Sequence, residues 1–238
     1  TLGPLESFAT LVYTSGFNGI AAVDLNADGW VDVVGSQASD RVTGGWSVAL
    51  GNGSGSFLPA VKYMAGQAPS AMAVADVDRD NDRDVAVTSF YSLEATVHLN
   101  QGNGTFGMPP ITGLPLNSTD LEAADIDLDG DLDLATSGGL NNGVFAILKN
   151  RGDGTFDPYT SFTMPFEGRY IRLVELNGPT AVEGPPDLLW AGGWDYEFYT
   201  RENLGDGTFA PVVSHAVNGC GFGDINAYDI DGDGDRDV

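Results

Sequence analysis

Carboxylates recur on every second residue in four short segments of the sequence, residues 24–32, 76–84, 125–133 and 229–237. These segments, called the acidic loops below, hold 18 of the 34 Asp and Glu residues. A hard cation such as Ca²⁺ takes about six to eight oxygen ligands, and alternate residues of a tight loop can point their side chains at one centre. The sequence therefore predicts about four calcium sites.

The expected side-chain ligands are the first, third and fifth residues of each loop. The sixth residue should adopt a left-handed conformation, which suits glycine and is tolerated by asparagine; it is Gly29, Asn81, Gly130 and Gly234. The ligand residues are Asp24, Asn26 and Asp28 in the first loop, Asp76, Asp78 and Asp80 in the second, Asp125, Asp127 and Asp129 in the third, and Asp229, Asp231 and Asp233 in the last.

A fifth segment falls at the same place in the pattern but has a different spacing. Asp187 follows Glu175 by twelve residues, where the acidic loops have eight, and the insertion contains three prolines. Because the spacing of the ligands defines such a site, we expect no metal in this segment.

An EF-hand loop begins in the same way as these segments but differs at its end. It needs Glu at its twelfth position and a helix on each side. The twelfth residues of the first three loops are Gly35, Val87 and Thr136, and the flanking sequences are typical of strands. The sequence therefore excludes an EF-hand.

The overall charge restricts the partners of the protein. The formal net charge of −24 argues against nucleic acid and anionic membrane surfaces as partners. No apolar run approaches the roughly 18 residues that a membrane-spanning helix needs, so we expect no membrane insertion.

The elements that position the loops repeat with a period of about 50 residues. Short runs of small and β-branched residues flank each loop, as in "AMAVA" and "DVAVTS" around the second and "LEAAD" and "DLATSG" around the third. A third run follows, and then a glycine-rich turn that ends in Phe57, Phe106, Phe156 or Phe209, from which a fourth strand should begin. Four short strands in a repeat of this length predict an all-β fold, a β-propeller with four-stranded antiparallel blades.

About four and a half blades are expected in the 238 residues. Their predicted bounds are 16–66, 67–116, 117–165 and 166–214, with residues 1–15 forming the outer strand of a preceding or closing blade and residues 215–238 a partial fifth blade. The fifth blade lacks its two middle strands, and open strand edges are normally covered. We therefore expect the chain to be part of a propeller with six to eight blades, completed by further blades of the same chain or by a neighbouring subunit.

The pattern D-x-[DN]-x-D-G-x-x-D between two strands, followed by "GNGTF" or "GDGTF", resembles the FG-GAP (VCBS-type) repeat of the integrin α-subunit propeller and of many bacterial extracellular proteins. The resemblance implies a secreted or cell-surface protein that binds calcium and acts in adhesion. It also implies that the seventh loop residue gives its backbone carbonyl to the metal and the ninth its carboxylate. These residues are Trp30, Asp82, Asp131 and Asp235 for the carbonyls and Asp32, Asp84, Asp133 and Asp237 for the carboxylates.

Aromatic residues gather in the fourth repeat, at Trp190, Trp194, Tyr196 and Tyr199. They could stack on a sugar ring or anchor a protein loop, or they could pack between blades as part of the core. The alternation of "EFY" favours the core.

Catalytic motifs are missing from the sequence. The sequence has two histidines, His98 and His215, and neither belongs to an H-E-x-x-H motif; no G-x-S-x-G motif occurs either, so we expect no enzyme. The predicted function is a calcium-stabilised extracellular scaffold for binding, adhesion or assembly, with a protein or glycan ligand. The alternative is a glycan-binding, lectin-like module or an accessory domain of a carbohydrate-active enzyme.

Overall fold

The structure is a computed structural model that describes residues 17–37, 44–107, 111–138, 143–165, 168–176, 184–192, 196–217, 225–231 and 236–238. The predicted outer strand at residues 1–15 and the residues Trp194, Asp233, Gly234 and Asp235 lie outside these ranges.

The described chain forms four antiparallel sheets of four strands each, in sequence order, and contains no helix. This confirms the all-β fold with propeller blades. The first sheet comprises β1 (Phe17–Val23), β2 (Asp32–Gln37), β3 (Gly45–Ala49) and β4 (Val61–Met64), and the second β5 (Pro69–Ala75), β6 (Asp84–Ser89), β7 (Glu94–His98) and β8 (Ile111–Gly113). The third comprises β9 (Ser118–Ala124), β10 (Asp133–Gly138), β11 (Val144–Leu148) and β12 (Thr160–Thr163), and the fourth β13 (Tyr170–Val174), β14 (Asp187–Ala191), β15 (Glu197–Arg201) and β16 (Val213–Ala216).

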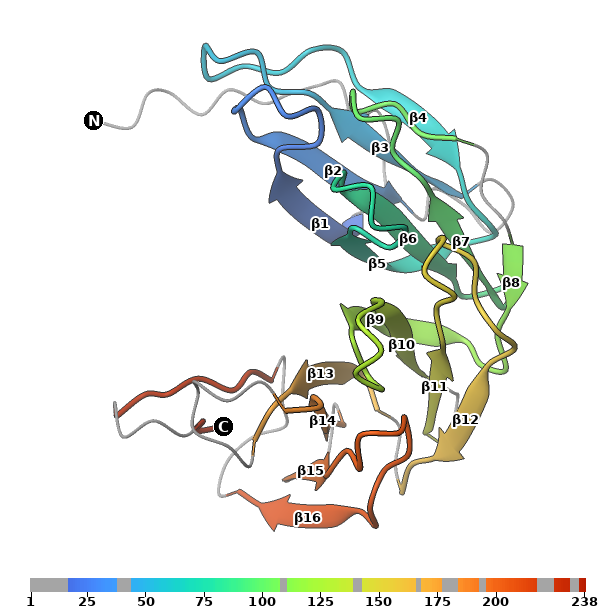
Figure 1. Cartoon of the computed structure of the whole chain (residues 1–238), viewed down its shortest axis with the longest axis vertical. Coiled ribbons are helices and arrows are strands. Elements are labelled where there is room, and N and C mark those ends of the chain that lie inside the picture. The colour runs from blue at the N-terminus through green and yellow to red at the C-terminus, as the bar shows by residue number, and fades with distance from the viewer. Residues whose placement is uncertain are drawn as a thin grey trace.

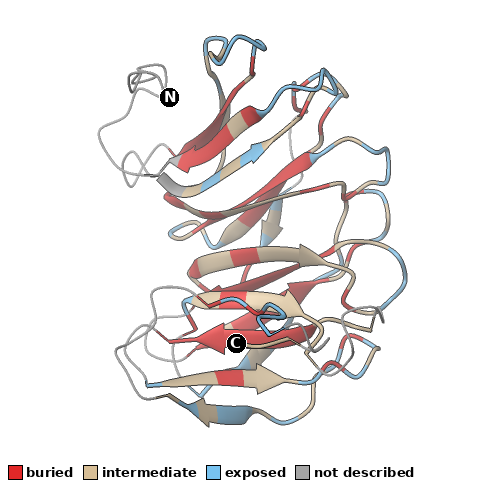
Figure 2. Ribbon diagram, turned by 90° about the vertical axis from the view of Figure 1, so that its left-hand side faces the viewer, coloured by how far each residue is buried: buried red, intermediate tan, exposed pale blue. Residues whose placement is uncertain are grey.

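The four sheets follow one another along an arc, with β1, β5, β9 and β13 on its inner side and β4, β8, β12 and β16 on its outer side (Figure 1). The second strands lie between neighbouring sheets, and every residue of β6, β10 and β14 is buried. A strand that is buried on both faces needs a continuous run of small or apolar residues rather than an alternating pattern. Figure 2 shows this burial in the strands and the exposure of the connecting loops.

The start of the fourth strand differs from the sequence prediction. Phe57, Phe106, Phe156 and Phe209 do not open that strand; each forms an isolated β-bridge back across the glycine-rich turn. The strand begins four or five residues later, and each intervening segment contains a proline, as at Pro59 and Pro158. Proline has no N–H for a β-ladder, which delays the strand.

The hydrophobic core is divided into separate clusters, one at each junction between sheets. Trp46 and Val48 of the first sheet pack with Val85 and Val87 of the second. Leu121, Leu134 and Leu148 pack against the second sheet in the same way, and Leu188 and Trp190 against the third. Each sheet therefore depends on its neighbours for burial, as in other repeat proteins.

Beyond the fourth sheet, Ile225 and Ala227 pack on Leu189 and Ala191, and Tyr228 forms an isolated bridge with Asp237. These contacts lie in the segment predicted as a partial fifth blade. Within its described ranges the structure has no helix that is long and apolar enough to cross a membrane.

Candidate metal centres

The first three acidic loops each connect the first and second strands of a sheet; the last acidic loop follows Tyr228, which bridges to Asp237. The second loop, for example, runs from the end of β5 to the start of β6. As predicted, the sixth residue is left-handed in the three loops where it is described, with φ of 85° at Gly29, 73° at Asn81 and 89° at Gly130. This turn directs the chain back toward its first carboxylate, which accepts the N–H of the sixth residue.

A second left-handed residue occurs at the fourth position, which the sequence analysis did not identify. Ala27, Arg79 and Leu128 have φ of 56°, 63° and 59°. A left-handed conformation is unfavourable for residues with a Cβ, so the loop imposes this geometry through its hydrogen bonds rather than through residue preference. The types of these residues therefore do not indicate their left-handed conformation.

The structure brings three of the predicted ligand residues together in each of three loops; Asp80 and Asp133 are not members of their loops' groups. Ligand atoms lie within 4.8 Å of one another in the groups Asp76, Asp78 and Asp84, Asp125, Asp127 and Asp129, and Asp229, Asp231 and Asp237. In the first loop, Asn26 instead donates its side-chain N–H to Asp28 at 3.0 Å. Trp30 is 52 % exposed in that loop.

The first carboxylate of the second and third loops has one oxygen with a hydrogen bond and one without. Asp76 Oδ2 accepts the N–H of Asn81 at 3.0 Å, and Asp125 Oδ2 accepts that of Gly130 at 2.9 Å. The Oδ1 atoms of Asp76 and Asp125, and Oδ1 of Asp127, are buried without a hydrogen-bond donor. Buried carboxylate oxygens without a donor are costly, and a hard cation is the partner that several converging oxygens could share.

The ninth carboxylate has a role that the sequence analysis did not identify. Asp84 is buried, its Oδ2 accepts the N–H of Val77 at 2.9 Å, and its Oδ1 accepts that of Asn100 at 2.8 Å. The carboxylate thus ties the start of its loop to the segment that follows the third strand, β7, of its own blade. Asp32 and Asp133 accept the corresponding pairs of N–H groups. Burial raises the pKa of Asp84 and that of Asp133 to about 6, although these hydrogen bonds oppose the rise.

In the fourth blade the anchoring carboxylate is present although the metal loop is not. Asp187 accepts the N–H of Leu176 at 3.0 Å and that of Asn203 at 2.8 Å, although the preceding segment is longer than the acidic loops. Burial raises the pKa of Asp187 as well. Since this blade lacks the ligand spacing, the ninth carboxylate does not need a complete metal loop to hold its position.

An asparagine before the glycine-rich turn of the second, third and fourth blades joins neighbouring blades. Asn150 Nδ2 donates to the carbonyl of Val77 at 2.7 Å, in the second loop, and to that of Leu132 at 2.9 Å, in the third. Asn100 donates in the same way to Leu25 and Arg83, and Asn203 to Ile126 and Pro186. The sequence did contain this signal, because an asparagine precedes the turn at the same place in three repeats.

The glycine-rich turn of one blade also covers the acidic loop of the blade before it. A methyl group placed on Gly154 would lie 2.8 Å from Leu99 and 3.5 Å from Cβ of Asp78. At the next junction, Lys149 Nζ donates to Asp127 Oδ2 at 2.8 Å and to the carbonyl of Asp206 at 3.0 Å. The acidic loops therefore lie at the contacts between blades, where a bound ion would affect both.

The candidate ligand surface in the fourth blade is largely core. Trp190 and Tyr199 are buried and stack with a centroid separation of 5.2 Å. They fill the junction with the third blade, as the alternation of this segment favoured, and do not form the alternative, a ligand surface. Tyr196, at 61 % exposure, is the member of the group that the structure places on the surface.

Comparisons of the sequence and of the fold found similar proteins. Residues 24–87 and 76–136 each match the sequence profile described as "FG-GAP-like repeat". A search of curated proteins found no match. Among solved structures, a lectin of Agrocybe aegerita is similar with a TM-score of 0.54 and 22 % identity, over 81 % of this chain and 50 % of the lectin chain. Its structure is described as the basis of specific recognition of non-reducing terminal N-acetylglucosamine.

This chain spans half the length of that lectin chain, and at this identity the likeness concerns the fold. The profile matches cover the first three acidic loops, whose ligand spacing and left-handed turns are described above. Residues 24–136 therefore contain FG-GAP-like repeats, and these repeats fold as β-propeller blades.

Proposed function

We propose that the chain is a calcium-stabilised extracellular scaffold that binds a protein or glycan ligand and has no catalytic activity of its own. The observation that carries the calcium assignment is the set of buried carboxylate oxygens without donors in the second and third loops, at Asp76, Asp125 and Asp127. Asp76 lies in one group with Asp78 and Asp84, and Asp125 and Asp127 lie in another with Asp129. Oxygen-only ligand sets of this kind suit calcium.

Calcium would neutralise each loop and fix it against the turn of the following blade. The second loop would contribute Asp76, Asp78 and Asp80, with Asp84 close enough to take part, and the third Asp125, Asp127 and Asp129. Because these loops lie at junctions between blades, the ion would stabilise the array and keep its surfaces in fixed positions for a ligand. This is the basis of the scaffold proposal.

The proposal is tested by thermal unfolding with and without calcium. Chelation with EDTA should lower the melting temperature by several degrees, because any ligand that binds only the folded state stabilises it by mass action. Calcium should restore the melting temperature, and magnesium should do so poorly because it prefers a smaller octahedral shell. A melting temperature that EDTA leaves unchanged would refute the calcium assignment.

Two variants locate the effect. Asp76→Asn removes a carboxylate with a donorless oxygen and should reduce the difference between the calcium and EDTA melts. Asp153→Asn removes one negative charge from the glycine-rich turn, where Asp153 hydrogen-bonds to Thr155, and should leave that difference unchanged.

Glycan binding is the second candidate, supported by the likeness to a lectin that recognises N-acetylglucosamine. A cavity of about 430 Å³ lies between β4 and β7–β8, lined by Tyr63, Thr96 and His98 among others. Its volume is in the range of sites for small ligands. An array of immobilised glycans should then retain the protein.

The glycan test needs a blocking variant on a surface residue. Ile111 is 68 % exposed at the rim of this cavity, and Ile111→Arg should abolish glycan retention. Ile20→Arg is the matched control, since Ile20 is 66 % exposed on β1 away from the cavity and its replacement should have no effect. Equal retention of both variants would exclude the cavity as the site.

A further inference from the structure

The first residue after the third strand of the first three blades occupies an equivalent place, where it meets the glycine-rich turn of the next blade; these residues are Leu50, Leu99 and Lys149. A methyl group on Gly104 would lie 2.8 Å from Leu50, one on Gly154 2.8 Å from Leu99, and one on Gly207 2.6 Å from Lys149 Nζ. Two of these residues are leucines and the third is a lysine. The third junction thus places an ammonium group where the first two place a branched alkyl group.

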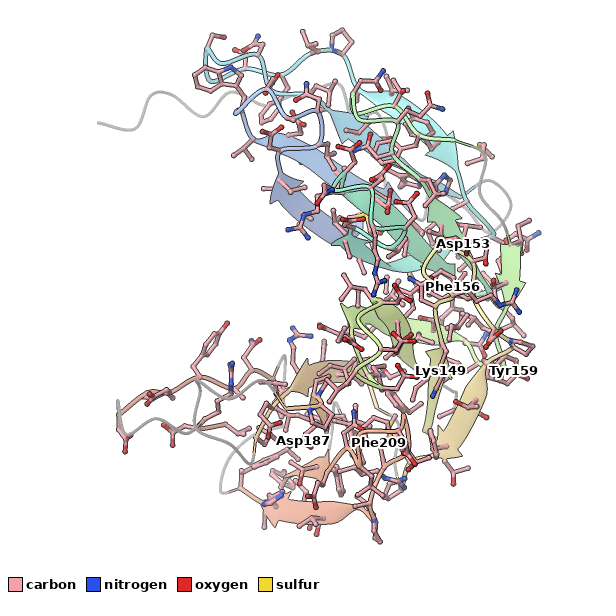
Figure 3. The ribbon with its side chains drawn as sticks, in the orientation of Figure 1. Lys149, Asp153, Phe156, Tyr159, Asp187 and Phe209 are labelled. Atoms are coloured by element: carbon pink, nitrogen blue, oxygen red, sulfur yellow. The ribbon has the colours of Figure 1, made fainter. Side chains whose placement is uncertain are left out.

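Lys149 is directed at the third acidic loop. Its Nζ lies 2.8 Å from Asp127 Oδ2 and 3.0 Å from the carbonyl of Asp206, a residue of the glycine-rich turn in the fourth blade. Figure 3 shows Lys149 beside the strand end from which it extends, on the side of Phe209 and its turn. The lysine therefore bridges the acidic loop of one blade and the turn of the next.

A second basic side chain reaches the same loop. Arg79, from the second loop, has its Nε 2.6 Å from Asp131 Oδ1. In contrast, within the described residues no basic side chain forms an ion pair with Asp76, Asp78 or Asp80 of the second loop. Two acidic loops with the same number of carboxylates thus differ in how far the chain itself neutralises them.

We propose that Lys149 is a resident cation of the third loop, and that the third loop consequently binds calcium more weakly than the second. This inference rests on the proposed function. The ammonium group takes one oxygen of Asp127 and repels a divalent ion nearby, while it holds the third and fourth blades together when no calcium is bound. Calcium dependence is then unequal along the array, with the second loop the more dependent.

The inference is tested by calcium titration calorimetry of Lys149→Met, which removes the charge and keeps the length of the aliphatic stem. Because the variant lacks the ammonium group that takes an oxygen of Asp127 and repels the ion, the calcium affinity of the third loop should rise roughly tenfold. Asp125→Asn in the same background should remove that gain, which assigns it to the third loop. The reciprocal variant Leu99→Lys should weaken the second site by a similar factor.

The charge control is Arg151→Met. Arg151 is two residues from Lys149 but pairs with Asp157 on the glycine-rich turn, at 2.6 Å, so its loss changes the net charge equally without touching an acidic loop. It should leave both calcium affinities unchanged. If Lys149→Met also leaves them unchanged while the wild type binds calcium, the resident-cation inference is wrong.

Thermal unfolding in EDTA gives a second readout that does not require calcium binding. Without calcium, Lys149→Met should melt at a lower temperature than wild type and lower than Arg151→Met, because the bridge between blades is lost. A wild type that binds no calcium would refute the proposed function, and the EDTA melts would still decide whether Lys149 joins the two blades. Equal EDTA melts of the two variants would refute that bridge.

Discussion

At the scale of single residues, buried polar side chains have distinct structural roles. Asp84 and Asp133 are carboxylates that accept two backbone N–H groups each, and in their folded positions they join a loop to the segment that follows the third strand. His98 is a buried polar residue of another kind. It lies in the junction of the first two blades with its ring 5.1 Å from that of Trp46, and its burial lowers its pKa to about 4.

The lowered pKa makes His98 a source of acid sensitivity. Since the unfolded chain has a histidine pKa near 6.5, the unfolded state binds the proton more tightly, and stability falls as the pH drops from about 6.5 toward 4. The contribution at pH 5 is about 2 kcal/mol. His98→Gln cannot be protonated, so its free energy of unfolding should fall less than that of wild type between pH 7 and pH 5 in calcium buffer.

Urea unfolding at the two pH values measures this difference. His215→Gln is the control, because it removes the other histidine, which is only partly buried and bonds to Thr200. Carboxylates that titrate in the same range are present in all three proteins and cancel in the comparison. A loss of stability for His98→Gln equal to that of wild type would contradict the assignment.

At the scale of strands and turns, the repeat pattern predicted much of what the structure has. The bounds of β6 and β10 coincide with the runs "DVAVTS" and "DLATSG", because a doubly buried strand needs an uninterrupted run of small and β-branched residues. The glycine-rich turns have positive φ at both glycines, such as 75° at Gly102 and 73° at Gly104. Strand bounds and turn conformations can be predicted from the sequence because they depend on neighbouring residues.

Contacts between distant residues were harder to predict. Lys149 meets Asp206 across 57 positions, and nothing in the local sequence indicates that pairing. The left-handed Ala27 and Leu128 are set by a hydrogen-bonded loop and not by residue type. The interblade asparagines could have been found, since Asn100 and Asn150 stand at equivalent repeat positions, but only the structure shows that their amides reach the preceding blade.

These asparagines give a prediction about the junctions. Asn150→Ala removes the two hydrogen bonds that the side chain donates to the carbonyls of Val77 and Leu132 and the one that it accepts from Gly152. At about 0.5–1.5 kcal/mol per bond it should destabilise the protein by about 3 kcal/mol. Asn103→Ala is the matched control, since Asn103 is exposed and bonds only within its own turn, to Thr105. Chemical unfolding should show less than half the effect for the control, and equal effects would contradict an interblade role.

At the scale of the whole molecule, stability is distributed over the junctions between sheets, while negative charge is concentrated in the four acidic loops. With a net charge of −24 and 18 acidic residues in four loops, the calcium-free protein should be strained by mutual repulsion. In the described part of the arc in Figure 1, each hydrophobic cluster belongs to one junction. No common hydrophobic core of these sheets therefore offsets the repulsion.

Salt should therefore stabilise the calcium-free protein more than the calcium-loaded one. Raising NaCl from about 0.01 M to 1 M shortens the Debye length from about 30 Å to 3 Å and screens the repulsion between loops. The melting temperature in EDTA should rise by several degrees across this range, and that in calcium should change much less. Parallel salt dependences with and without calcium would show that the loops are not the source of the strain.

The anchor at Asp187 has a practical consequence for protein engineering. Its carboxylate binds the N–H groups of Leu176 and Asn203, so it closes the base of a segment that already holds four residues more than the acidic loops. The entropic cost of closing a loop grows only slowly with its length. A foreign peptide grafted between Leu176 and Asp187 would thus be displayed from a fixed base, and the blade beneath it would keep both of the hydrogen bonds that set its geometry.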